Sequence, residues 1–176
     1  MTVEVINETT HQVDAEEFAL LAEFVMHQMH VSPAAELSIL FVDTEAMTRL
    51  HQQWMDLPGP TDVLSFPMDE LQPGTPAEVT SEGMLGDVVV CPSVAADQAA
   101  AAGHTIQEEM LLLVTHGILH LLGYDHADPE DREVMFALQR RLLLTFLAEA
   151  GRPNEQMRTD GPADGPAGDP AEAPRG

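Results

Sequence analysis

The chain has 176 residues, with 30 acidic side chains, seven arginines and no lysine, so its formal net charge is −23. Such a surface repels the nucleic-acid backbone and anionic membranes, which argues against bulk binding to either, and no DNA partner is expected. The single cysteine excludes an intrachain disulfide, no apolar run reaches the roughly 20 residues of a membrane span, and the N-terminus does not resemble a signal peptide. We therefore expect a cytoplasmic protein.

Hydrophobic periodicity divides the first 150 residues into strands and helices. Alternating or apolar runs predict strands at residues 3–6, 37–42, 61–66 and 87–90, the last of them central in the sheet. Helical patterns with their start and stop signals predict helices at residues 15–29, 44–55, 92–103, 106–122 and from 129 onward. This order predicts an α+β fold, in which a small mixed sheet of about four strands is covered by about five helices.

Some of these elements carry sharper expectations. Thr44 is the expected cap of its helix, which should turn Trp54 inward, and Thr105 should cap the helix that ends at Leu122. That last helix is apolar nearly all round, which is typical of a buried helix. Residues 68–83 are acidic and rich in turn formers, so they should form a long surface loop.

The C-terminal segment differs in composition from the rest. Residues 151–176 contain five prolines and five glycines and almost nothing apolar. Such a composition cannot bury enough apolar surface to fold, so we expect a domain at residues 1–150 followed by a disordered tail at 151–176.

Three histidines stand close together on and after the buried helix. His116 and His120 are four residues apart and therefore share one helix face. Gly123 offers a left-handed stop, after which His126 can approach the first two from a loop. Three neutral imidazoles with a fourth position left for water form a catalytic zinc arrangement, so we expect one Zn²⁺ per chain and a zinc-bound water as the reacting group.

Alternatives to this interpretation remain open. A lone histidine on an apolar helix is usually a core residue, and imidazole also suits copper, nickel and iron. Cys91 is a possible fourth ligand that ranks below water. The spacing matches the H-E-x-x-H-x-x-G-x-x-H motif of metzincin proteases, but Gly117 stands where those enzymes carry their general base, so a peptidase would need another carboxylate.

The run HGILHLLGYDH at residues 116–126 resembles the signature of the YbeY family, bacterial rRNA maturation factors described as single-strand endoribonucleases. PTDVLSFP at 60–67 is similar to the P-T-[DN]-V-L-S-F strand of that family, and LGDVVV at 85–90 is similar to its L-G-D-[IV] strand. The three stretches occur in the family's order, and the resemblance covers about residues 1–150.

The resemblance implies a zinc-dependent, single-strand-specific endoribonuclease that acts in 16S rRNA 3′-end maturation and ribosome quality control. Its metal ligands would be His116, His120 and His126, and its partners would be rRNA precursors or single-stranded RNA, with ribosomal proteins of the small subunit. Many members carry an arginine six residues before the threonine of the P-T-[DN]-V motif, taken to contact RNA phosphate. This chain has Met55 there, so either the role moves, with Arg49 as the candidate, or this branch of the family does without it.

Several further side chains are weaker candidates for a role in the site. Asp125 could shape the turn before the third ligand or act as a base. Asp62 and Asp87 could orient ligand imidazoles, although strand-end positions favour a structural role. Ser65 and Phe66 could line a cleft, with Phe66 as a stacking surface, and Trp54 could be a platform for a base, but Phe66 and Trp54 are expected in the core instead. His104 is expected in an exposed loop and Glu109 outside the metal's direct contacts.

Two other functions compete with the ribonuclease. Another metal-dependent hydrolase would use the same histidines on a peptide or small molecule. A non-catalytic ribosome assembly factor would use zinc structurally, and its acidic surface would dock a basic ribosomal protein.

Overall fold

The computed structural model describes residues 2–149. The expected tail at 151–176 lies outside the described residues, so the domain boundary near residue 150 stays a prediction. Within residues 2–149, no helix combines the length and the apolarity needed to cross a membrane.

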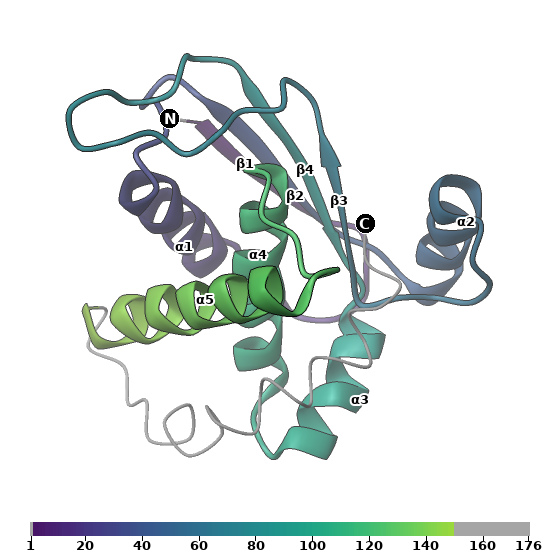
Figure 1. Ribbon diagram of the computed structural model, residues 1–176. Helices are drawn as coiled ribbons and strands as arrows, with labels where there is room; N and C mark the ends of the chain where they lie inside the picture. The colour runs from purple at the N-terminus through teal and green to yellow at the C-terminus, as the bar shows by residue number, and fades with distance from the viewer. Residues whose placement is uncertain (1, 150–176) are drawn as a thin grey trace.

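Within residues 2–149, four strands form one mixed sheet, as predicted. They are β1 (Thr2–Asn7), β2 (Glu36–Phe41), β3 (Val63–Pro67) and β4 (Met84–Val90). The spatial order is β1-β2-β4-β3, with β1, β2 and β4 parallel and β3 antiparallel to β4. The expectation that the run at 87–90 is central is confirmed, and β3 is left at an edge of the sheet (Figure 1).

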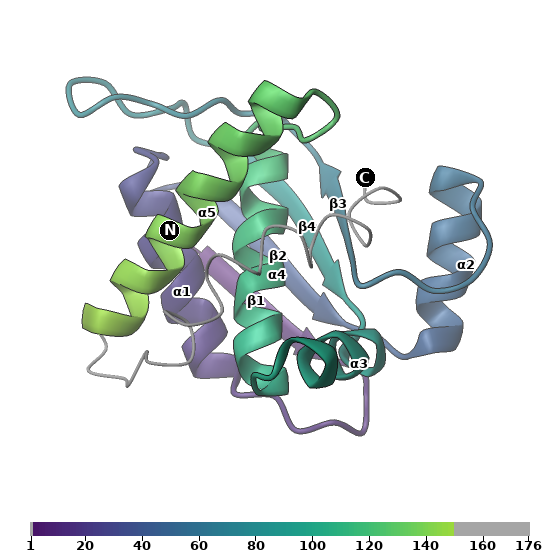
Figure 2. The same cartoon turned by 60° about the horizontal axis from the view of Figure 1, so that its bottom comes forward.

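Five helices accompany the sheet in the part of the chain that the structure describes. They are α1 (Ala15–Gln28), α2 (Thr44–Met55), α3 (Pro92–Ala102), α4 (Ile106–Leu121) and α5 (Pro129–Glu149). The main core lies where α1 and α4 cover one face of the sheet and α5 crosses over both (Figures 1 and 2). Helix α2 stands apart, beyond the β3 edge (Figure 2). A smaller apolar cluster on the opposite face of the sheet includes Met47 of α2, Leu64 of β3 and Val89 of β4.

The start of α4 confirms the predicted capping box, because Thr105 and Glu108 satisfy each other's backbone N–H groups. The start of α2 differs from the prediction. Asp43, not Thr44, is the cap, and its carboxylate accepts a hydrogen bond of 2.8 Å from Ala46 N. Aspartate and threonine are both good caps, so the sequence alone could not choose between neighbours.

The prediction that Trp54 points inward is wrong, because 59% of this residue is exposed. Of the residues of α2, only Met47 and His51 are buried. The helix lies beyond the β3 edge of the sheet, so no further helix or strand of the described residues covers its outer side (Figure 2). Phe66, also expected in the core, is half-buried beside Trp54.

The long loop at residues 68–83 is anchored rather than free over its whole length. Leu71 is buried in the main core, Gly74 N donates to Met29 O at 3.0 Å, and Thr80 N donates to His30 O at 3.0 Å. These contacts fix the loop to the connection between α1 and β2.

Candidate metal centre

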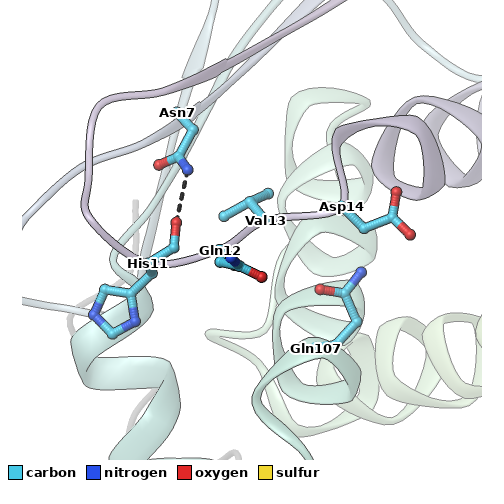
Figure 3. Close-up of a pocket in the computed structure, with 6 residues that line it drawn as sticks. All are labelled: Asn7, His11, Gln12, Val13, Asp14 and Gln107. Carbon is cyan, nitrogen blue, oxygen red and sulfur yellow. Dashed lines mark hydrogen bonds between the residues drawn. The ribbon is translucent and has the colours of Figure 1, made fainter.

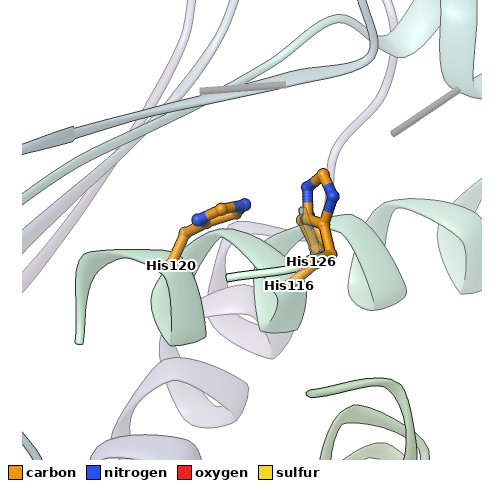
Figure 4. A group of neighbouring side chains, drawn as sticks. All are labelled: His116, His120 and His126. Atoms are coloured by element: carbon orange, nitrogen blue, oxygen red, sulfur yellow. The ribbon is translucent and has the colours of Figure 1, made fainter. Parts of the chain in front are cut away.

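The three histidines of the motif meet as predicted. His116 and His120 lie on one side of α4, with ring centroids 5.0 Å apart, and His126 comes from the following loop to within 5.2 and 4.9 Å of them (Figure 4). One ring nitrogen from each lies within 4.8 Å of the other two. Imidazole nitrogen is a ligand for zinc and other transition metals, so this donor set can hold a metal ion.

The turn after α4 brings His126 back to the helix. Gly123 adopts φ +98°, a conformation that favours glycine, and Tyr124 N donates to Leu119 O at 3.0 Å. Asp125 Oδ1 then accepts hydrogen bonds from His126 N at 2.7 Å and Ala127 N at 3.2 Å. Of the two roles considered for Asp125, these bonds support the shaping of the turn.

Gln139 of α5 orients the first histidine. The Nδ1 atom of His116 and the Oε1 atom of Gln139 are 2.8 Å apart, and both residues are buried. Because an amide oxygen accepts, Nδ1 carries the proton and Nε2 carries the lone pair that a metal requires. Sequence reasoning missed this residue, although a glutamine on the otherwise apolar inner face of α5, one turn after Met135, was an available signal.

Gly117 allows α4 to approach the sheet closely. A Cβ atom at this position would lie 2.7 Å from Val88 Cγ1 and 3.2 Å from Ser65 Oγ, and Ser65 Oγ donates to Gly117 O at 3.0 Å. A glutamate side chain, which metzincins carry at this point of the motif, would collide with β4. The close packing of α4 on β3 and β4 therefore explains why the protease base is missing.

A cation lies beside the third histidine. Arg132, in the first turn of α5, donates from Nε to the carbonyl oxygen of His126 at 3.3 Å. Arg49, the candidate named from the sequence, is instead exposed on α2 and forms an ion pair with Glu45 at 3.1 Å. Met55 is half-buried against the smaller cluster.

The remaining candidates lie away from the three imidazoles. Cys91 is buried in the smaller cluster on the other face of the sheet, where burial raises the pKa of its thiol. Asp62 Oδ1 accepts from Val63 N at 2.8 Å and so shapes the start of β3. Asp87 pairs in register with Phe66, so it points away from α4, which Val88 faces. In the described part of the chain, the group of side chains able to hold a metal contains the three histidines alone.

The prediction that His104 is exposed is wrong. His104 is buried, and its Nε2 atom lies 2.6 Å from Oε1 of Glu109, which is buried as well. The loop before α4 is covered by α3 and α4 packing together, so a residue outside any helix still lies inside the protein. Glu109 is therefore engaged with His104, consistent with its expected absence from the metal's direct contacts.

A polar pocket lies at the opposite end of α4 (Figure 3). It is lined by Asn7, His11, Gln12, Val13, Asp14 and Gln107. Gln107 precedes His116 by nine residues, a rise of about 13 Å along the helix, so the pocket is separate from the histidine cluster.

The fold and the site together define a small α+β protein with a three-histidine centre on a buried helix. The family model described as "Endoribonuclease YbeY" matches residues 4–147. The chain therefore belongs to the YbeY endoribonuclease family, and the resemblance of its three motifs is confirmed.

Proteins of known name support this assignment. The chain is similar to the "Endoribonuclease YbeY" of Kineococcus radiotolerans, with 57% identity over 96% of this chain and 100% of the relative. It is similar to the protein of the same name from Beutenbergia cavernae, with 64% identity over 84% of this chain and 99% of the relative. A solution structure from Thermotoga maritima shares the fold, with a TM-score of 0.57 and 25% identity over 84% of this chain and 90% of the other.

Proposed function

We propose that this chain is a zinc-dependent, single-strand-specific endoribonuclease that acts in the cytoplasm in 16S rRNA 3′-end maturation and ribosome quality control. The observation that carries the proposal is the meeting of three imidazoles, with ligand atoms within 4.8 Å, in a member of an endoribonuclease family.

In this proposal His116, His120 and His126 hold the metal, and Gln139 fixes the ring orientation of His116. Zinc held by neutral ligands would supply a Lewis acid for a phosphoryl oxygen and would lower the pKa of water to about 7. The three ligands come from a rigid helix and a turn closed by Gly123, so the geometry is set before the substrate arrives.

Arg132 is our candidate for contact with the scissile phosphate. Its Nε atom donates to His126 O, and a guanidinium has further N–H groups that suit a phosphate oxygen. It would take the place of the arginine for which this chain has Met55. Arg49 is the weaker candidate, because its guanidinium pairs with Glu45.

A general base would come from a group outside the metal ligands. Gly117 has no side chain, and Oδ1 of Asp125 is engaged by two backbone N–H groups, which makes it a weak candidate. Cleavage products carrying a 2′,3′-cyclic phosphate would show that the RNA 2′-hydroxyl is the nucleophile, and their absence would favour water.

The test combines metal analysis with cleavage of a single-stranded rRNA precursor for wild type, His120→Ala and the control His27→Ala, an exposed histidine of α1. We expect stoichiometric zinc and cleavage in the wild type and the control, and loss of both in a folded His120→Ala variant. Zinc without cleavage would favour the non-catalytic assembly factor, and unfolding of His120→Ala would favour a structural metal.

An acidic chain of net charge −23 also suits a basic partner. We propose that ribosomal proteins of the small subunit bring it to the rRNA. Pull-downs from salt-washed and unwashed ribosomes should recover such proteins, and recovery of no ribosomal component would contradict this part of the proposal.

A further inference from the structure

Trp54 is exposed at the last turn of α2, with 59% of its surface accessible. Its ring centroid lies 5.9 Å from that of Phe66 on β3, and the rings meet edge to face at 69°. Singly exposed apolar residues are common, so exposure alone says little. The position of this aromatic pair relative to the metal centre makes it informative.

Adjacent residues of the edge strand point toward α4 and toward the aromatic pair. Ser65 faces α4 and donates to Gly117 O, next to His116 in the chain. Phe66 follows Ser65 and therefore points to the opposite face, where it meets Trp54. β3 is the edge of the sheet, and α2 lies beyond it (Figures 1 and 2). RNA that passes from the histidine centre over this edge would therefore run toward α2, the helix that carries Trp54.

The segment between α2 and β3 is held in place. Nδ1 of His51 hydrogen bonds to Gly59 O at 2.9 Å, and Asp56 ends α2 in a left-handed conformation. The Trp54 side chain therefore sits on a fixed helix end. A rigid aromatic surface loses little conformational entropy when a flat ligand covers it.

Negatively charged side chains near Trp54 and Phe66 favour contact with an uncharged part of a ligand. Asp87 pairs in register with Phe66 and puts a carboxylate on the same face of the sheet, and Asp56 follows the last turn of α2. These groups repel a phosphate. A nucleobase, however, presents an uncharged face that stacks on tryptophan whatever its sequence.

We propose that Trp54, supported by Phe66, is a base-stacking subsite for a nucleotide of single-stranded RNA that flanks the cleavage position. This inference rests on the proposed function. Bases in a duplex are stacked on one another and cannot reach the indole, so the subsite contributes to single-strand preference. It also supplies affinity beyond the few phosphate contacts that a chain with seven arginines and no lysine can offer.

The chain has one tryptophan, so tryptophan emission, excited beyond the absorption of the single tyrosine, reports this subsite alone. Zinc-loaded full-length protein is titrated with a 2′-O-methyl oligoadenylate, chosen to slow cleavage, and with an abasic oligomer of the same length. We expect saturable quenching by the oligoadenylate and little by the abasic strand. Equal quenching by both strands, or by neither, would overturn the inference.

Variants provide the second measurement, with binding followed by the anisotropy of a labelled oligoadenylate. Trp54→Leu should raise the dissociation constant for the oligoadenylate about tenfold, which corresponds to about 1.4 kcal/mol. The factor should be similar at every salt concentration, because stacking on tryptophan involves no phosphate contact. Trp54→Phe should retain most of the affinity, and the control Leu20→Ala, at an exposed residue of α1, should retain all of it. Unchanged binding of Trp54→Leu would contradict the proposal.

The two proposals fail differently. Cleavage of single-stranded RNA by the wild type without quenching would overturn the stacking subsite and leave the ribonuclease intact. Quenching and weaker binding of Trp54→Leu without any cleavage would support the subsite and overturn the catalytic proposal alone.

Discussion

His116 on α4 and Gln139 on α5 are joined by a hydrogen bond of 2.8 Å between ring Nδ1 and amide Oε1. The bond links the helix that carries two of the candidate ligands to the helix that covers it. It also selects the tautomer in which His116 Nε2 can bind a metal.

Replacement of Gln139 by leucine should therefore weaken zinc binding by about 10- to 100-fold, the usual effect of losing a residue that orients a ligand. Competition with a chromophoric chelator measures this affinity. Gln139→Glu keeps an acceptor for Nδ1 and should bind zinc at least as tightly as wild type. Equal affinities in the leucine variant and the wild type would contradict the role of Gln139.

Gly117→Ala should lower the free energy of unfolding by about 1–3 kcal/mol, although alanine is the better helix former. The new Cβ would lie 2.7 Å from Val88 Cγ1, and both α4 and β4 are parts of the core that cannot shift freely. Urea denaturation followed by circular dichroism measures the loss.

The double variant Gly117→Ala, Val88→Ala serves as the control for this steric explanation. Removal of the valine methyl groups relieves the clash, so the double variant should be more stable than the sum of the two single losses predicts. Strict additivity would show that the clash is not the cause.

His104→Ala should destabilise the protein by about 1–3 kcal/mol, because it removes a buried hydrogen-bond partner of Glu109. Zinc content should stay at the wild-type level, since this pair lies around the start of α4, whereas His116 and His120 lie in its second half and His126 in the loop that follows. Thermal unfolding with metal analysis checks both statements. His27→Ala, at an exposed histidine, should change neither, and loss of zinc in His104→Ala would link the pair to the site.

Asp87→Asn should change the dependence of stability on pH. Burial raises the pKa of Asp87 above its ordinary value of 3.8, so the folded chain binds this proton more tightly than the unfolded chain. The resulting stabilisation is fully present below 3.8 and is lost as the pH rises through the folded pKa. The asparagine variant lacks this loss, so its melting temperature should exceed that of wild type increasingly toward neutral pH.

The control for this comparison is Asp97→Asn, at an exposed aspartate of α3. Its melting temperature should follow the wild type across the same pH range. A constant difference between Asp87→Asn and wild type at all pH values would contradict the titration argument.

Features that depend on local spacing can be predicted from the sequence. The interval between His116 and His120, the stop at Gly123 and the capping box of Thr105 with Glu108 all act within a few residues, and the structure contains each of them. The alternating and helical patterns likewise predicted four strands and five helices, because the period of the apolar residues distinguishes the two.

Which elements meet, by contrast, depends on how distant segments pack in the folded chain. Gln139 lies 23 residues from His116, Val88 and Gly117 belong to different elements, and no local pattern encodes these contacts. Trp54 has the spacing of a core residue but lies beyond the edge of the sheet, whereas His104 lies in a loop but is buried. Periodicity shows which face of an element is apolar; what covers that face depends on packing between segments that are distant in the chain.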